Sequence, residues 1–232
     1  MLYFLLRRIK RRLKNDFFCF FAKKSLNTVY VFGDSHGTYC FRKLIRQHIN
    51  LSCNAITMHR VGRDGIPFFC SRFCHPSNVF IFCYGEIDCR NHVARQLEKG
   101  RSLQDITRLL VDSYFERIAR SVSSCSKIIV CSLPPPAKFS GKLEPLNQKF
   151  FPHAGSDQDR LIFTKKINSL ICEASLAYGF GFLDLFRGFE DSSGFLLESM
   201  SDGICHIVHN DLVLERLVVL LDAPSSLQSR CH

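Results

Sequence analysis

The chain lacks long apolar runs near its N-terminus, internal repeats, and any recognised nucleic-acid-binding module. A membrane-spanning helix needs about 20 apolar residues, and the apolar runs in residues 1–24 are shorter. No small-residue cleavage site follows a proper apolar core. We therefore expect neither a transmembrane helix nor a signal peptide here, and no specific nucleic-acid partner.

Acidic residues are scarce, above all at the N-terminus. The chain holds 31 Lys and Arg against 21 Asp and Glu, a formal net charge of +10. Residues 1–24 contain eight basic side chains and a single acid, Asp16, so the rest of the chain carries little excess charge. The basic character thus belongs to an N-terminal arm, residues 1–27.

Two interpretations of this arm stay open. Its apolar residues recur at roughly helical spacing, which is typical of an interfacial helix on an anionic membrane surface. A solvated leader that favours solubility fits the same composition. The protein is expected to be cytoplasmic, with peripheral membrane contact through residues 1–24 if the first interpretation holds. The apolar positions are Leu2, Leu5, Leu6, Ile9 and Leu13.

Twelve cysteines are too thinly spread to predict a disulfide scaffold. Disulfide frameworks are typical of short secreted chains, whereas Cys83, Cys131 and Cys172 lie in apolar segments, which indicates reduced thiols in an intracellular protein. Cys70 and Cys74 have the spacing of a zinc pair, but no second pair stands at a convincing distance. No metal and no cofactor are expected.

Apolar runs alternate with helical patterns between residues 28 and 222. Such alternation predicts right-handed crossovers and a parallel sheet with helices on both faces. Residues 28–222 then form one α/β domain, followed by a tail at 223–232. The expected strands are 28–32, 54–58, 78–84, 127–133 and 182–186, and the expected helices are 36–49, 103–122, 157–178 and 212–221.

Polar side chains gather where the expected strands end, at residues 33–37, 59–65 and 85–92. Reactive groups of parallel sheets lie at the carboxyl ends of the strands. Ser35 stands where strand turns into helix, so it is a candidate nucleophile, although a Gly-Asp-Ser turn also serves as a plain helix cap. The long loop 137–156 is expected to cover the crevice.

A serine nucleophile needs a base, and the base needs a group that orients it. Late in the chain, Asp202 and His206 provide both. With these residues, the Gly33-Asp34-Ser35 block and Gly85-Glu86-Ile87-Asp88, the chain resembles the GDSL or SGNH hydrolases. The resemblance implies a three-layer α/β/α flavodoxin-like fold, and metal-free hydrolysis of an ester or acetylated substrate.

The resemblance also implies roles for individual residues. The amides of Ser35 and Gly62 would hold the oxyanion, while Ile87 stands where the family has a donating Asn. The sequence resembles a branch marked by GEIDCR, residues 85–90, some members of which are associated with surface glycans. The family spacing would place the base at Cys205, one residue before His206.

The remaining polar residues near the expected crevice have two interpretations. Arg90 either binds an anionic or sugar-acid substrate or forms an internal ion-pair cluster with Glu86 and Asp88. Arg63 is the better substrate contact of its loop. Asp34 and His36 are expected to line or structure the site. The predicted function is an SGNH-like serine esterase acting on a small acylated molecule or glycan; the alternative is a catalytically impaired protein of the same fold that binds a glycan or anionic ligand.

Overall fold

The central sheet has five strands, all parallel, in the order β2-β1-β3-β4-β5. The computed structural model describes residues 25–44, 46–122, 126–139 and 151–222, so the arm 1–24 and the tail 223–232 lie outside it. This strand order is the flavodoxin-like one, and the expected fold class is confirmed. The strands are β1 (Val29–Gly33), β2 (His48–Asn50), β3 (Val79–Cys83), β4 (Lys127–Cys131) and β5 (Gly181–Leu183).

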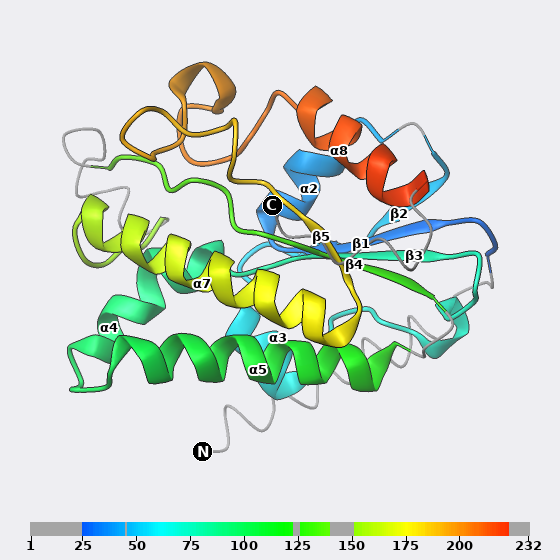
Figure 1. Cartoon of the computed structure of the whole chain (residues 1–232), viewed down its shortest axis with the longest axis horizontal. Coiled ribbons are helices and arrows are strands. Elements are labelled where there is room, and N and C mark those ends of the chain that lie inside the picture. The colour runs from blue at the N-terminus through cyan, green and yellow to red at the C-terminus, as the bar shows by residue number, and fades with distance from the viewer. Residues whose placement is uncertain (1–24, 45, 123–125, 140–150, 223–232) are drawn as a thin grey trace.

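Helices cover both faces of the sheet and make three layers (Figure 1). Successive strand residues point to opposite faces, so Tyr30 and Phe32 belong to one apolar core and Val29 and Val31 to the other. One core packs under α3 (Met58–Asp64), α5 (Leu103–Ser121) and α7 (Asp157–Tyr178), the other under α2 (Ser35–Phe41) and α8 (Asp211–Asp222). The short elements are η1 (Ser71–Phe73), η2 (Asp88–His92), α4 (Val93–Leu97) and η3 (Glu198–Met200).

The long helices begin where their capping residues predict. Ser102 accepts a hydrogen bond from the Asp105 N–H at 3.0 Å and so caps α5. Ser156 and Asp159 form a reciprocal capping box at the start of α7, which ends at Gly179 with φ +67°. These caps satisfy backbone donors that helix starts leave free, which explains why the expected helical ranges hold here.

The helix expected at 36–49 is wrong beyond its first turns. α2 ends at Phe41, and Ile49 belongs to β2. The cause is the edge of β1, whose backbone groups need partners. Residues after α2 supply them, because the Val29 N–H donates to Gln47 O at 3.0 Å and the Leu51 N–H donates to Val31 O at 2.7 Å. Strand pairing overrides the helical spacing in this segment.

The strand expected at 54–58 is also wrong. This segment turns at Ala55, with φ +60°, and Thr57 then caps α3 by accepting from the Arg60 N–H at 3.1 Å. Gly62 therefore lies inside a helix and not in a tight loop; only Gly65, the helix C-cap with φ +99°, has the expected conformation. A Cβ on Gly62 would lie 3.0 Å from Ser113 Cβ, so this glycine lets α3 approach α5 closely.

The fifth strand is shorter than expected, and the GEIDCR block is helical. β5 ends at Leu183, although Leu185 is still fully buried. Residues after Gly85 continue into η2, a π-helical turn, and into α4. None of the described helices is long and apolar enough to cross a membrane.

Most cysteines in the described ranges are buried free thiols, as expected, with an exception at Cys172. Cys83 and Cys131 are free and buried on neighbouring strands. Cys172 is disulfide-bonded, so the expectation of reduced thiols throughout is wrong at that position.

Candidate active site

Ser35 lies at the carboxyl edge of the sheet, as the first residue of α2. The strand β1 ends at Gly33, and Asp34 caps the helix by accepting from the His36 N–H at 2.9 Å. A Cβ on Gly33 would lie 2.8 Å from both Cys83 O and Gly37 Cα, so only glycine permits this turn. We call Gly33, Asp34 and Ser35 the nucleophile turn. It directs the Ser35 side chain out of the sheet.

The candidate base lies in a closed loop, residues 202–206, which we call the base loop. The Asp202 N–H donates to His206 O at 3.0 Å, and Asp202 Oδ1 accepts three backbone N–H groups, those of Ile204, Cys205 and His206. Gly203 takes φ +84°. The loop thereby accommodates the one residue by which the spacing of Asp202 and His206 exceeds that of the family that the sequence resembles. Ile204 is exposed to solvent, and Cys205 is buried.

The structure brings Ser35, His206 and Asp202 into one hydrogen-bond chain. His206 Nε2 lies 2.9 Å from Ser35 Oγ, and His206 Nδ1 lies 2.6 Å from Asp202 Oδ2. A carboxylate oxygen only accepts, so the imidazole proton sits on Nδ1, and Nε2 accepts from the Ser35 hydroxyl. The imidazole that faces Ser35 is thus that of His206, one residue past the spacing of the family that the sequence resembles, and the exposed His209 takes no part in this hydrogen-bond chain.

The electrostatics keep His206 neutral and Asp202 charged. Burial lowers the pKa of His206, the positive charge of His36 lowers it further, and the bond to Asp202 opposes both. Burial raises the pKa of Asp202, but hydrogen bonds from His206 and from the loop backbone outweigh it and bring this pKa to about 2. At neutral pH the pair is a carboxylate beside an unprotonated base.

Sequence analysis missed two residues that support the His206 imidazole, one by direct contact and one through the first. The ring of Tyr39 stacks on that of His206, with centroids 4.1 Å apart and planes 9° apart. The buried Asn210 does not contact the imidazole itself; it donates to Tyr39 O at 2.7 Å and ties α2 to the segment that follows the base loop. Tyr39 stands one helical turn after Ser35, so the i, i+4 relation was the signal that could have found it.

The two backbone amides that were expected to hold the oxyanion, those of Ser35 and Gly62, lie at different positions in their helices. Ser35 is the first residue of α2, and the first N–H groups of a helix have no acceptor within it. Gly62 does not fit the donor role, because it is the fifth residue of α3, where N–H groups bond within the helix. The Ile87 side chain has no donor. Sequence analysis also missed Ser52, which lies near the nucleophile turn. Its buried Oγ packs so closely against Gly37 that a Cβ at that position would clash with it.

The charged block after β3 splits into two structural units. Arg90 Nε donates to Glu86 Oε1 at 2.8 Å, and a second nitrogen of Arg90 donates to Pro152 O at 2.6 Å. Asp88 takes a different partner and caps α3, accepting from the Met58 N–H at 2.7 Å. Burial raises the pKa of Asp88 to about 7, against the lowering effect of these backbone donors. The ion-pair interpretation fits Arg90 and Glu86 but not Asp88.

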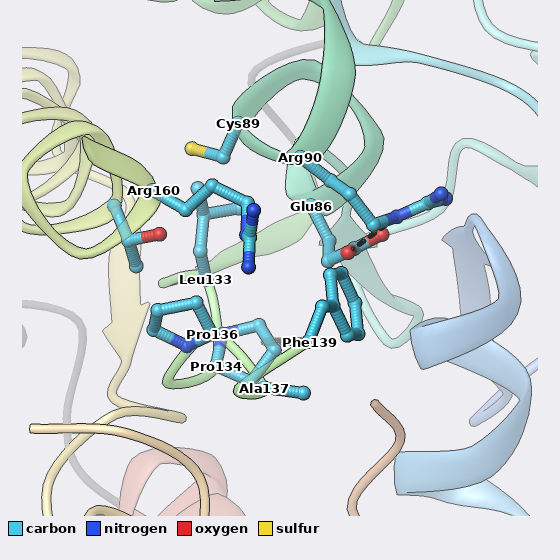
Figure 2. A pocket seen from close by; sticks show the side chains of 10 residues that line it. Glu86, Cys89, Arg90, Leu133, Pro134, Pro136, Ala137, Phe139 and Arg160 are labelled. Atoms are coloured by element: carbon cyan, nitrogen blue, oxygen red, sulfur yellow. Dashed lines mark hydrogen bonds and ion pairs between the residues drawn. The ribbon is translucent and has the colours of Figure 1, made fainter. Parts of the chain in front are cut away.

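Figure 2 shows the side chains that line the small pocket beside this block. The buried Arg160 guanidinium points into it, and the ion pair of Arg90 with Glu86 stands on the opposite side. Its free space is about 10 Å³, room for one water molecule. Since a salt bridge neutralises each guanidinium and the space is so small, the pocket does not fit a substrate anion.

A larger pocket of about 650 Å³ lies beside the base loop. Its size suits a small organic ligand, and its lining includes Ser201, Gly203 and Ile204. Arg63 is not among the residues that line this pocket. It is exposed on α3 and paired with Asp64 through two hydrogen bonds of 2.9 and 3.0 Å.

Among the described residues, one group of three side chains has the spacing of metal ligands: His36, Cys205 and His206. The Nε2 atoms of both histidines already have partners. His36 Nε2 contacts Cys205 O at 3.1 Å, and His206 Nε2 contacts Ser35 Oγ at 2.9 Å. This arrangement serves hydrogen bonding between the nucleophile turn and the base loop. Cys70 and Cys74 belong to no such group within the described part of the chain.

Comparison with known proteins shows the fold. No protein-family model matches the chain, and neither does any curated protein sequence. A GDSL-like lipase from Bacteroides thetaiotaomicron is similar in structure, with 13% identity, a TM-score of 0.55, and coverage of 92% of this chain and 95% of that one. An extracellular lipase from Streptomyces rimosus has 15% identity, a TM-score of 0.51, and coverage of 83% and 98%. The OSK domain of Drosophila Oskar has 13% identity, a TM-score of 0.51, and coverage of 87% and 91%. The chain shares the three-layer fold of GDSL-like lipases and acylhydrolases.

Proposed function

We propose that the protein is a serine hydrolase that cleaves an ester or O-acetyl bond. The observation that carries the proposal is the hydrogen-bond chain from Ser35 Oγ through His206 to Asp202, with distances of 2.9 and 2.6 Å. Nucleophile, base and orienting carboxylate stand in the relation that acyl transfer needs. The fold shared with GDSL-like lipases is consistent with this chemistry but does not carry it.

The reaction follows from the positions of these groups. Ser35 Oγ attacks the carbonyl carbon while His206 Nε2 takes the hydroxyl proton, and Asp202 stabilises the imidazolium that forms. The Ser35 N–H, at the start of α2, holds the oxyanion. His206 then gives the proton to the leaving alcohol. A water molecule, deprotonated by the same nitrogen, cleaves the acyl-serine to a carboxylic acid and restores Ser35.

We propose a small acyl ester as the class of substrate and, within this class, an O-acetylated glycan as the specific substrate. We assign the alcohol part to the pocket of about 650 Å³, which contacts the base loop at Gly203 and Ile204 but is not lined by Ser35 or His206. The alternative function is a protein that binds an anionic ligand through Arg90 without turnover. The structure offers it little support, because the Arg90 guanidinium already donates to Glu86 and to Pro152 O.

Membrane contact through residues 1–24 also stays a proposal, because those residues lie outside the described ranges. Deleting the arm is expected to abolish co-sedimentation with anionic liposomes and to leave ester hydrolysis unchanged. Co-sedimentation that does not depend on the arm would contradict this proposal.

The test of the hydrolase proposal is Ser35→Ala with p-nitrophenyl acetate and with a fluorophosphonate probe. We expect wild type to turn over the ester and to be labelled at Ser35, and the variant to lose both. Ser169→Ala is the matched control, since that serine is exposed on α7 and bonded to Glu173. Equal hydrolysis by wild type and Ser35→Ala, or labelling at another residue, would refute the proposal.

A further inference from the structure

His36 lies directly under the candidate site and makes two polar contacts there. It follows Ser35 in the sequence, and its side chain is fully buried. Its Nε2 lies 3.1 Å from Cys205 O in the base loop, and its Nδ1 lies 3.3 Å from Asp34 Oδ1 in the nucleophile turn. One imidazole therefore bridges the two segments that supply nucleophile and base.

The two contacts determine the protonation of His36. A backbone carbonyl only accepts hydrogen bonds, so Nε2 carries a proton. Nδ1 makes no hydrogen bond among the described residues, but it lies 3.3 Å from a carboxylate oxygen, where a lone pair would be repelled and a proton attracted. Asp34 is also buried, and its Oδ2 has no hydrogen-bond partner among the described residues, so a cation beside this carboxyl group stabilises its charged form. Both ring nitrogens are thus protonated, and His36 is an imidazolium.

The other groups around His36 do not compete for this charge. Burial raises the pKa of Cys40 and brings that of Cys205 to about 11, while a bond to Cys131 together with burial raises that of Cys83. These thiols are neutral at physiological pH. The titratable groups that face His36 are Asp34 after β1, Cys40 on α2, Cys83 on β3, and Cys205 and His206 in the base loop.

We propose that His36 is a positioning residue for the hydrolysis proposed above: a buried imidazolium that anchors the base loop through the Cys205 carbonyl and keeps His206 unprotonated by its charge. The ring centroids of His36 and His206 are 4.8 Å apart. At this separation a fixed positive charge opposes a second one on the neighbouring ring. Burial lowers the pKa of His36, but the interactions with Asp34 and Cys205 outweigh it and raise the pKa well above its ordinary value, which agrees with the geometry.

The first test is independent of turnover. In ¹⁵N-histidine-labelled protein, long-range proton-nitrogen NMR spectra report the tautomer and the charge of each imidazole, with His36→Gln and His206→Gln used for assignment. We expect both nitrogens of His36 to be protonated at pH 7, and His206 to titrate below the ordinary value of about 6.5. A neutral His36 at pH 7 would overturn the proposal.

The second test removes the charge and keeps the hydrogen bond. The glutamine of His36→Gln can donate to Cys205 O but carries no charge, so the pKa of His206 and the acid limb of kcat/KM should both rise by about one pH unit. His36→Leu removes the bond as well, and a misplaced base should lower kcat by about 100-fold. His48→Gln is the control, since that histidine bonds to Arg46 O on the edge strand β2.

The outcomes separate this inference from the proposed function. Wild type without ester turnover contradicts the hydrolase, while the NMR spectra still test His36. Turnover with an unchanged His206 pKa in folded His36→Gln overturns the role of His36 alone. If His36→Gln does not fold, the wild-type spectra decide, because a charged His36 is their direct readout.

Discussion

Replacing Asp202 by Asn should separate base orientation from folding. In the wild type, Asp202 Oδ1 accepts three backbone N–H groups and Oδ2 accepts the proton of His206 Nδ1 at 2.6 Å. An asparagine keeps one oxygen for the backbone and presents an NH₂ group to His206. That group only donates, so the imidazole proton moves to Nε2, and Nε2 no longer accepts the Ser35 proton.

The expected cost lies in the chemical step. A base held in the wrong tautomer lowers kcat by roughly 10³ to 10⁴ in serine hydrolases with this arrangement, which corresponds to about 4 to 5.5 kcal/mol of barrier. Folding should survive, because the asparagine oxygen still accepts from the loop backbone. KM should change little, since Asp202 does not contact the substrate.

Stability gives a second readout with a defined sign. The pKa of Asp202 is about 2 in the folded protein, and a depressed carboxyl pKa stabilises the folded state above the unfolded pKa. The difference from an unfolded pKa of about 3.9 corresponds to at most about 2.6 kcal/mol, which solvent screening of the partly exposed carboxylate lowers to about 2 kcal/mol, and this stability is lost as the pH falls from about 5 to about 2. The free energy of unfolding of Asp202→Asn should therefore fall less than that of wild type as the pH is lowered over this range.

The assay is p-nitrophenyl acetate hydrolysis at pH 8, paired with urea unfolding at pH 7 and pH 4. Asp184→Asn is the matched control. Asp184 also holds a turn, accepting from the Phe186 and Arg187 N–H groups, but has no bond to the base loop. A folded Asp202→Asn that retains kcat within tenfold of wild type would refute the orienting role and the mechanism with it.

Three further predictions concern pH and packing. Because the pKa of His206 is lowered, kcat/KM should stay level from pH 8 to about 6.5 and fall below it; a fall that begins above pH 7 would contradict this. Gly33→Ala should destabilise by about 1 to 3 kcal/mol in urea unfolding, since its Cβ would lie 2.8 Å from Cys83 O; an unchanged midpoint would count against the packing argument. The buried Asp88 has a raised pKa of about 7, so its contribution is full below about pH 4 and declines as the pH rises to 7. Asp88→Asn should therefore reduce the loss of stability between pH 5 and pH 8, which unfolding curves at both values would measure.

The sequence could predict much of the fold because local signals and burial agreed there. The apolar run before Ser35 forms β1, and Ser102 and Ser156 cap the helices that follow them. The segment 42–62 could not be predicted in this way. Its helical spacing competed with the unpaired edge of β1, and pairing with that edge outweighed local preference.

Some residues of the candidate site could likewise be predicted from the sequence, and others could not. Ser35, Asp202 and His206 were recognisable by residue type and by their order along the chain. The oxyanion role of Gly62 failed because α3 begins before that residue, where Asp88 and Thr57 cap it. Tyr39 and Asn210 went unnoticed because their contacts, Tyr39 with His206 and Asn210 with Tyr39 O, join distant parts of the chain.

By itself the sequence determined the parallel α/β class, the strand-to-helix turn at Ser35 and the supply of an acid and an imidazole near the end of the chain. These depend on apolar spacing, glycine and capping residues, which act over a few neighbouring positions. Only the tertiary structure decided that His206 and not Cys205 faces Ser35, and that His36 joins the two segments. Those outcomes depend on how the base loop folds around Asp202 and on burial beside Asp34, which side chains far apart in sequence create together.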